Sequence, residues 1–280
     1  MMTTKTTLLA ATALLVAGAQ AQDRVELASD GRDRSIGLTF GGLGASFGGR
    51  SLSSKYLKFD IQPVKQFKLW FGSQSLDAKG KEDPATGNRS TFDARATEFG
   101  MRYEFQSRGG APFGVSYIAH RSGDGTFEQT DGSSALYFGP KTDTFEVDHE
   151  GWSGSYSRIK AGSRSASVFG VGYAGKQPLK AKGWSFLYEG KLLFERPSGT
   201  VVNPDGSTRA MARLGLEYGS PEWGSISLSA YVFPGGIPYT GTPLSGFTSF
   251  FLYEPGGVAD DLRTKTSATL DLRVSLKASF

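Results

Sequence analysis

The clearest pattern along the chain is a strict alternation of apolar and polar residues close to its C-terminus. From Ala268 to Phe280 every even-numbered residue is apolar, and from Ser267 to Ser279 every odd-numbered residue is polar or charged. A period of two predicts a β-strand with one apolar and one polar face. The strand exceeds the usual soluble length of about 5–6 residues and suits a tilted membrane crossing of about 9–11 residues.

Similar alternation predicts further strands, the most regular of which runs from Trp184 to Phe194. At about 3.3 Å per residue and a tilt near 40°, this segment rises roughly 25 Å, the height of the apolar band of a membrane barrel. An antiparallel sandwich around a core would also alternate. The other predicted strands are 34–47, 57–61, 67–71, 99–105, 113–119, 152–160, 169–173, 210–218, 226–232 and 247–253. With the terminal strand they make about twelve, within a range of ten to fourteen, the upper limit requiring a hairpin at 135–145.

The N-terminus separates these two fold classes. Residues 1–21 combine Lys5, an apolar run too short to span a bilayer as a helix, and the cleavage-site pattern Ala19-Gln20-Ala21. We therefore expect a signal peptide over 1–21, a short periplasmic lead over 22–33 and a single barrel over 34–280. Glycine supplies 38 of the 280 residues, which argues against long helices.

The terminal strand ends on Phe280, and here the chain resembles the bacterial outer-membrane β-barrel proteins, which close with an amphipathic strand and a terminal phenylalanine. The resemblance implies an all-β fold, a single closed antiparallel up-and-down barrel, located in the bacterial outer membrane. It also implies two partners: outer-membrane lipid, including lipopolysaccharide, and the barrel-assembly machinery, which recognises the strand that ends in Phe280.

Composition limits the chemistry that such a barrel performs. There is no cysteine, and the two histidines are His120 and His149, so we expect no disulfide, no metal site and no cofactor. The net charge is +4, or +3 without Lys5, and no block of basic residues is present. We therefore expect no nucleic-acid partner.

The polar faces of the predicted strands carry charges of both signs. We predict that they line the lumen, where they either pair into a network that plugs a narrow barrel or border water in a wider one. Arg209, Arg213 and Arg273 would form any patch that attracts anions. The predicted pore-lining residues are Lys68, Arg102, Glu104, Glu189, Lys191, Arg209, Arg213, Glu217, Asp271, Arg273 and Lys277.

The segment 123–150 is the longest polar stretch and is predicted to be an extracellular loop. It could also bind divalent cations or fold into the lumen, although it lacks the ligand spacing of an EF-hand. Its candidate residues are Asp124, Glu128, Asp131, Asp143, Glu146 and Asp148.

Three short motifs suggest other activities. The G-x-G-x-x-G motif at 170–175 has no helix after it, so we interpret its glycines as packing positions. His120 and Ser122 are similar to the His-x-Ser of outer-membrane lipid hydrolases, but Gly123 replaces the usual asparagine and both side chains should face inward. Asp148 and His149 are similar to residues of outer-membrane proteases, and a solvated loop is the simpler interpretation.

The leading functional hypothesis is therefore non-enzymatic: a passive, porin-like channel for small polar solutes. One alternative is a lipid hydrolase that uses His120 and Ser122. The other is a structural or surface-interaction barrel whose lumen is plugged.

Overall fold

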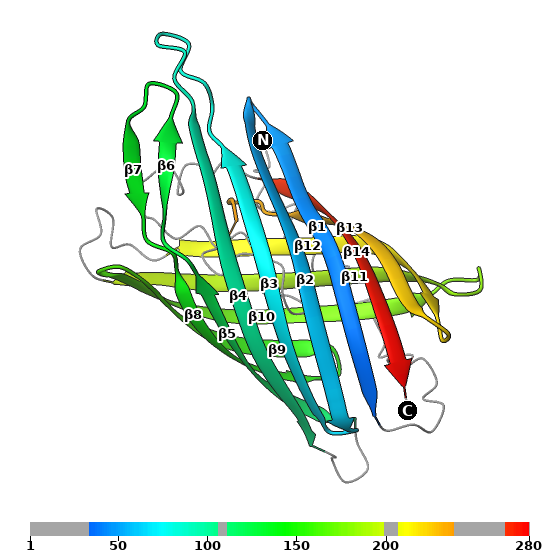
Figure 1. The fold of residues 1–280 in the computed structure, drawn as a ribbon. Helices are drawn as coiled ribbons and strands as arrows, with labels where there is room; N and C mark the ends of the chain where they lie inside the picture. Colours follow the sequence, from blue (N-terminus) through cyan, green and yellow to red (C-terminus); the bar gives the residue numbers. More distant parts are fainter. Residues whose placement is uncertain (1–33, 106–110, 199–206, 238–266, 280) are drawn as a thin grey trace, which may run out of the picture.

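The computed structural model describes residues 34–105, 111–198, 207–237 and 267–279. Within them, twelve strands close into one antiparallel barrel (Figure 1). The barrel strands are β1 (Ser35–Phe47), β2 (Arg50–Val64), β3 (Phe67–Lys79), β4 (Ser90–Phe105), β5 (Phe113–Ser122), β8 (Lys141–His149), β9 (Trp152–Ala161), β10 (Arg164–Pro178), β11 (Trp184–Ser198), β12 (Ser207–Ser220), β13 (Gly224–Val232) and β14 (Ala268–Ser279). The predicted fold class is confirmed.

The barrel closes where the first strand meets the last. β1 pairs with β14 in a continuous register from Ser35 opposite Ser279 to Gly44 opposite Leu270. Elsewhere each strand pairs with the next along the chain, except that β5 pairs with β8. Closure leaves no open sheet edge within the ring, which a membrane-spanning sheet requires because lipid offers no hydrogen bonds.

The prediction of one long loop over 123–150 is wrong in its second half. Residues 141–149 form β8, a barrel strand between β5 and β9. Its polar sequence concealed it, because its inward face is polar and its outward face has only Phe145 and Val147 as large apolar residues. The first half contains a hairpin of β6 (Gly125–Gln129) and β7 (Ser134–Tyr137), which extends the sheet from β4.

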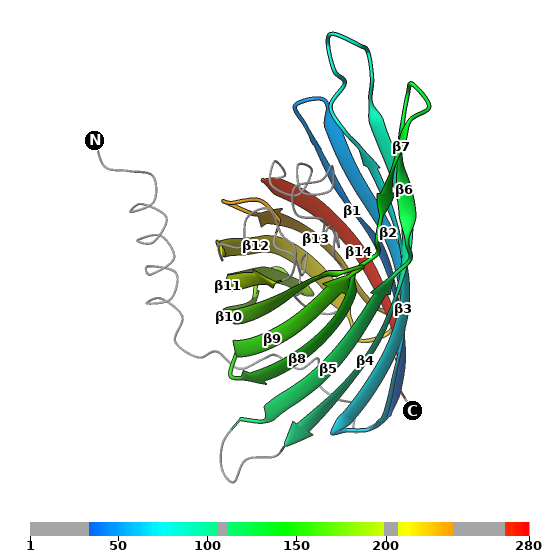
Figure 2. The ribbon, with the colours of Figure 1, turned by 90° about the vertical axis from the view of Figure 1, so that its left-hand side faces the viewer.

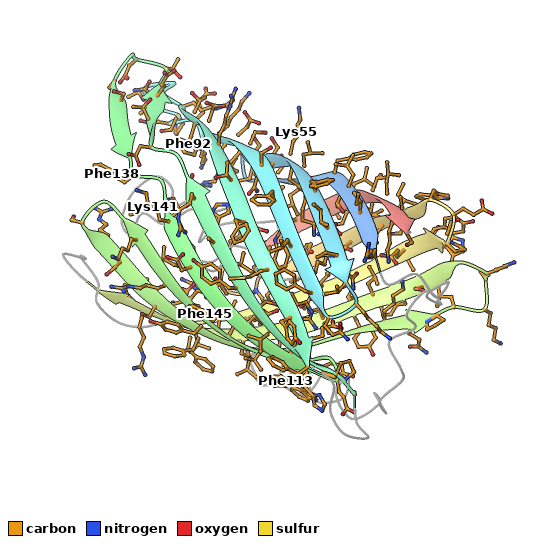
Figure 3. All side chains as sticks on the ribbon, turned by 60° about the horizontal axis from the view of Figure 1, so that its bottom comes forward. Lys55, Phe92, Phe113, Phe138, Lys141 and Phe145 are labelled. Atoms are coloured by element: carbon orange, nitrogen blue, oxygen red, sulfur yellow. The ribbon has the colours of Figure 1, made fainter. Side chains whose placement is uncertain are left out.

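The outer surface of the barrel is apolar. Leu270, Leu272 and Leu276 of β14 are 60%, 52% and 41% exposed, whereas Asp271 between them is 1% exposed. Phe113 and Phe145 likewise lie on the outside of the wall (Figure 3). This outward belt excludes the soluble sandwich, in which such leucines would be buried between two sheets. Among the described residues no helix is long and apolar enough to cross a bilayer.

The two ends of the barrel differ in their connections. Both termini of the described barrel lie at one end, with short turns such as 65–66 and 150–151. At the opposite end β3, β4 and the β6–β7 hairpin project beyond the rest (Figure 2). Outer-membrane barrels have short periplasmic turns and longer extracellular loops, so the projecting end is extracellular.

Several sequence predictions fall outside the described residues: the signal peptide and lead over 1–33, the strand at 247–253, and Phe280. The predicted strand at 152–160 is β9, and its register with β8 and β10 is continuous. The predicted number of twelve strands is right although its membership differs, because β8 was not included.

Candidate functional site

The candidate site is the charged interior of the barrel. Alternation with the exposed apolar residues places all eleven predicted pore-lining residues on the inward face of β3, β4, β11, β12 and β14. Asp148 and Glu146, predicted as loop residues, also face inward, from β8. The interior thus collects charges of both signs from nearly the whole circumference.

Arg102 illustrates how these charges meet. From β4 it forms two hydrogen bonds to the carboxylate of Asp148 on β8, one of them 2.9 Å from Nη2 to Oδ1, and it also contacts Glu104 at 3.0 Å. The strand between them, β5, carries Gly114 at this point. A methyl group at Gly114 would lie 2.5 Å from the guanidinium carbon of Arg102. The ion pair can therefore cross β5 because the residue of β5 at this position is a glycine and has no side chain.

A second group lies over Gly41 of β1. Tyr56 on β2 donates a 3.0 Å hydrogen bond to Asp271 on β14, and Arg273 donates to Tyr56 at 3.0 Å and to Asp271 at 2.8 Å. A methyl group at Gly41 would come within 2.7 Å of the Tyr56 ring. The Asp271 and Arg273 side chains are only 1% and 12% exposed, so this group is nearly dry.

Two glycines of the G-x-G-x-x-G motif, Gly170 and Gly172, serve the same purpose, whereas Gly175 faces outward beside Tyr188. Lys191 on β11 reaches Glu146 on β8 at 3.1 Å, crossing β10 and β9. Gly172 lies directly opposite Lys191, and a methyl group at Gly170 would be 2.9 Å from its Cε. The motif lies within a strand, and its first two glycines leave space for a luminal lysine. The packing interpretation of these two positions is confirmed.

Exposure of the charges falls from the periplasmic end toward the middle of the barrel. Near the periplasmic end, Lys68 is 38% exposed and pairs with Asp60 at 3.0 Å, and Lys176 is 30% exposed and pairs with Glu217. Deeper in, the Lys191 side chain is fully buried. The charges are therefore partly exposed at the periplasmic end and packed in the middle of the barrel.

The extracellular half of the lumen contains two apolar clusters, which were not predicted from the sequence, beside the ion pair of Glu195 and Arg209. One cluster of buried side chains runs from β12 through β13, β1, β2 and β3 to β4, half-way around the barrel. Phe233 and Ile237, just after β13, belong to it and are fully buried. Its members are Leu43, Leu52, Leu76, Ala78, Phe92, Ala94, Met211, Tyr231, Phe233 and Ile237, and a second cluster comprises Ile159, Ala161, Ala166, Val168 and Leu193. Most of these residues could have been predicted by continuing the alternation of inward and outward positions along each strand to its extracellular end.

The three luminal arginines predicted to attract anions all have protein partners. Arg209 lies 3.3 Å from Glu195, Arg213 donates to Ser229 at 3.1 Å and lies over the Tyr231 ring, and Arg273 is held by Asp271. The three side chains are therefore engaged with groups of the wall.

The candidate hydrolase residues face the lumen. His120 is 2% exposed, and Ser122 lies two residues further on the same face, with its hydroxyl 3.4 Å from the carbonyl of Gly123. Asp148 and His149 point to opposite faces, since Asp148 pairs with Arg102 inside while His149 lies outside, 3.9 Å from Glu150. The structure therefore does not bring the Asp-His pair together.

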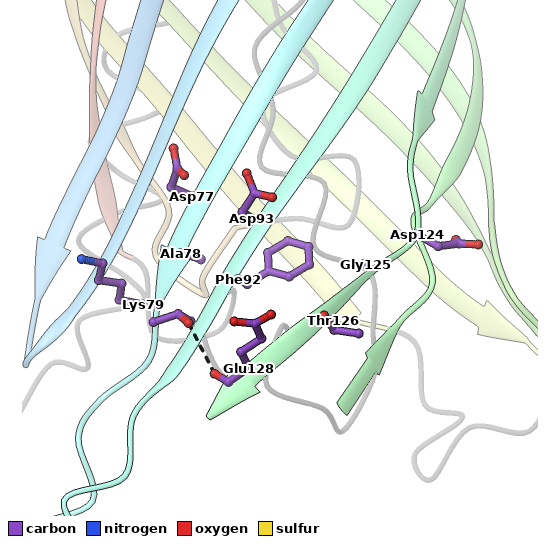
Figure 4. A pocket seen from close by; sticks show the side chains of 10 residues that line it. Asp77, Ala78, Lys79, Phe92, Asp93, Asp124, Gly125, Thr126 and Glu128 are labelled. Atoms are coloured by element: carbon purple, nitrogen blue, oxygen red, sulfur yellow. Dashed lines mark hydrogen bonds between the residues drawn. The ribbon is translucent and has the colours of Figure 1, made fainter. Parts of the chain in front are cut away.

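Of the remaining acidic candidates, Asp143 lies on the outward face of β8, 2.6 Å from Arg121, and the other three lie at the extracellular projection. Asp124 and Glu128 line a groove of about 410 Å³ between β3, β4 and β6 (Figure 4) together with Asp77 and Asp93, which are direct cross-strand neighbours. Within the described ranges, no three His, Cys, Asp or Glu side chains come close enough to hold a metal ion. Asp131 lies in the β6–β7 turn, where Asn88 binds it.

Known proteins resemble this chain only distantly. No protein-family model matches the sequence, and no curated protein matches it. The translocator domain of the autotransporter NalP from Neisseria meningitidis is similar over 98% of both chains, with 12% identity and a TM-score of 0.48. The β domain of the Bordetella autotransporter Brka is similar over 89% of this chain and all of that one, with 10% identity and a TM-score of 0.42.

Escherichia coli outer membrane phospholipase A is similar over 88% of this chain and 93% of that one, with 8% identity and a TM-score of 0.34. Likeness at these levels carries no argument about the activity of this chain. The closed ring, the outward apolar belt and the polar interior together define a bacterial outer-membrane β-barrel. This chain is such a barrel, and its location is the bacterial outer membrane.

Proposed function

We propose that this barrel is a passive channel for small polar solutes, closed in the described conformation at its extracellular half. The observation that carries the proposal is the contrast between the two halves of the lumen. Charges at the periplasmic end are partly exposed, whereas the extracellular half contains buried apolar clusters that include Phe233 and Ile237, and its Glu195 side chain, paired with Arg209, is buried.

The luminal charges support a transport role for an energetic reason. A buried ion pair is often no more stabilising than well-packed apolar residues of the same size. A barrel that only needed a filled interior could use the apolar packing of its extracellular half throughout. The charged groups instead supply hydrogen-bonding partners that replace the water around a polar solute once the packed middle layer opens.

The segment after β13 is the proposed closing element. Phe233 is anchored by a 2.7 Å hydrogen bond from its amide to the carbonyl of Ser267, just before β14. Its ring stacks 6.3 Å from that of Tyr231. These contacts bring an apolar side chain from the rim into the lumen, and moving it outward would join the extracellular side to the charged layer.

Single-channel recording from the whole mature chain in a planar bilayer tests the proposal. We expect Phe233→Ala with Ile237→Ala to raise conductance and open time above the wild-type level. The matched control is Val232→Ala, since Val232 neighbours Phe233 but faces lipid and is 45% exposed. A bilayer that remains silent with both the wild type and the double variant would contradict a channel.

A plugged, structural barrel is the second candidate, favoured by the Asp271 and Lys191 side chains, which are 1% and 0% exposed and paired. Silence in every recording, with a correctly folded barrel, would favour it. We also propose that the chain is not a hydrolase, because His120 and Ser122 face away from the acyl chains of the bilayer. Phospholipid hydrolysis that disappears in Ser122→Ala would overturn this.

A further inference from the structure

The outward-facing lysines and arginines of the described strands are distributed unevenly. All of them lie in the extracellular half of their strands, and in the periplasmic half the outward positions are apolar, aromatic or uncharged apart from His149. The bilayer therefore meets cations on the outer wall at one of its two surfaces. The residues concerned are Lys55, Lys79, Arg95, Arg121, Lys141, Arg158, Lys160 and Arg196.

Three of these cations are immediate neighbours. Arg121 on β5 lies directly opposite Lys141 on β8, and Lys141 lies directly opposite Lys160 on β9. Like charges at directly opposed positions of an antiparallel sheet repel each other. Asp143 offsets part of this repulsion through its 2.6 Å contact with Arg121, whereas Lys141 and Lys160 are exposed. The row therefore presents a surplus of positive charge to its surroundings.

An aromatic row lies below the cationic one at a constant spacing. Tyr117, Phe145 and Tyr156 are direct neighbours on β5, β8 and β9, and each lies four residues from the cation of its own strand. Phe145 is 55% exposed toward lipid. Four residues at about 3.3 Å with a tilt near 40° place the cations roughly 10 Å above the rings. Figure 3 shows Lys141 and Phe145 on the same outer wall.

The aromatic row lies only four residues from the periplasmic ends of β5, β8 and β9, so its rings face hydrocarbon, and the cations stand roughly 20 Å above those ends, near the upper edge of an apolar band about 25 Å tall. Long basic side chains at that edge extend their charged ends into the head-group layer. A ligand of this wall must therefore have an acyl chain that contacts Phe145 and an anionic group near Lys141 and Lys160. We propose that Arg121, Lys141 and Lys160 form a binding site for the phosphate groups of an outer-leaflet lipid.

The test uses the whole folded protein in a zwitterionic detergent, with diphosphoryl lipid A as the probe and native mass spectrometry to measure binding. We expect Lys141→Gln with Lys160→Gln to weaken binding about tenfold or more, since each variant residue no longer attracts the anionic lipid. The matched control is Lys55→Gln with Arg196→Gln, two outward cations elsewhere on the wall, which should leave binding within about twofold.

Each further outcome decides for or against the site. Weaker binding of lipid A that lacks one phosphate would support it. Equal affinity in the Lys141/Lys160 variant and the wild type would overturn it, as would an equal loss in the control variant. Displacement of lipid A by equimolar inorganic phosphate would show that the patch recognises free phosphate and not a lipid. Because the substituted residues are exposed, the variants should still fold, and unheated samples should migrate on a denaturing gel as the folded wild-type barrel does.

Discussion

Arg102 and Asp148 lie on strands that are not neighbours, yet their side chains form a bidentate ion pair across β5. Their side chains are 20% and 10% exposed, and Gly114 lies beneath them. The ion pair depends on two features of the lumen. Oppositely charged side chains point toward each other from β4 and β8, and the strand between them has a glycine where they meet.

Asp148→Ala should lower the free energy of unfolding by about 1–3 kcal/mol, less than for a fully buried pair because Arg102 keeps its contact with Glu104. The double variant with Arg102→Ala should be more stable than the sum of the single effects predicts, by a coupling of about 0.5–3 kcal/mol. Urea titrations in lipid vesicles provide the measurement. Glu82→Ala, which breaks an exposed loop pair with Arg89, is the control and should cost less than about 1 kcal/mol. Strict additivity would mean that the pair contributes nothing.

Gly100 lies against the indole of Trp70, so that a methyl group there would be 2.5 Å from Nε1. That nitrogen donates a 2.6 Å hydrogen bond to Glu98. Gly100→Ala should displace the ring, break this bond and cost about 1–3 kcal/mol. Gly190→Ala provides the comparison, because Gly190 has nothing within 4 Å of its added methyl group. Equal stability of the two variants would show that the inner wall accommodates a methyl group without adjustment.

The two faces of β14 should tolerate charge differently. Leu272 is 52% exposed to lipid, so Leu272→Arg should cost about 2–4 kcal/mol if it lies near the midplane of the bilayer. Ser275 faces inward, 3.0 Å from Thr39, and Ser275→Arg should cost less. Folding titrations in vesicles compare the two variants. A penalty for Ser275→Arg that matches or exceeds the other would mean that the inward face is as intolerant of charge as lipid.

The extracellular projection should loosen in acid. Hydrogen bonds from the hydroxyl and amide of Ser133 and from Asn88 lower the pKa of Asp131 below its ordinary value of 3.8. A lowered pKa stabilises the attachment above pH 3.8, and this contribution is lost as the pH falls through the lowered value. Hydrogen exchange of the Asp131 and Ser133 amides should therefore accelerate, relative to unstructured peptide, as the pH falls below 3.8. Asp131→Asn should remove this acceleration, and an unchanged pH profile in that variant would exclude Asp131 as the cause.

The sequence predicted strands well where the outer face is long and apolar, as in β11 and β14. It failed at β8, where Phe145 and Val147 are preceded by Lys141 and Asp143 on the outward face. The luminal pairs could not be predicted, because Lys191 and Glu146 belong to strands separated by two others. Their meeting depends on the stagger of the whole barrel, which no local pattern records. The inward direction of Lys191 was predictable, and its partner was not.

The seam between β1 and β14 joins the two ends of the chain, and the contact between Thr39 and Ser275 spans 236 residues. Most other neighbours in the ring are joined by a short connection, so most hairpins can form before the chain is complete. A polypeptide interrupted before residue 268 would leave the backbone hydrogen-bonding groups of β1 and β13 unmatched, ready to pair with other chains. A chain that lacks β14 therefore keeps two open sheet edges, which favour aggregation and are not tolerated in lipid. Only a chain that includes β14 can pair all of its barrel strands.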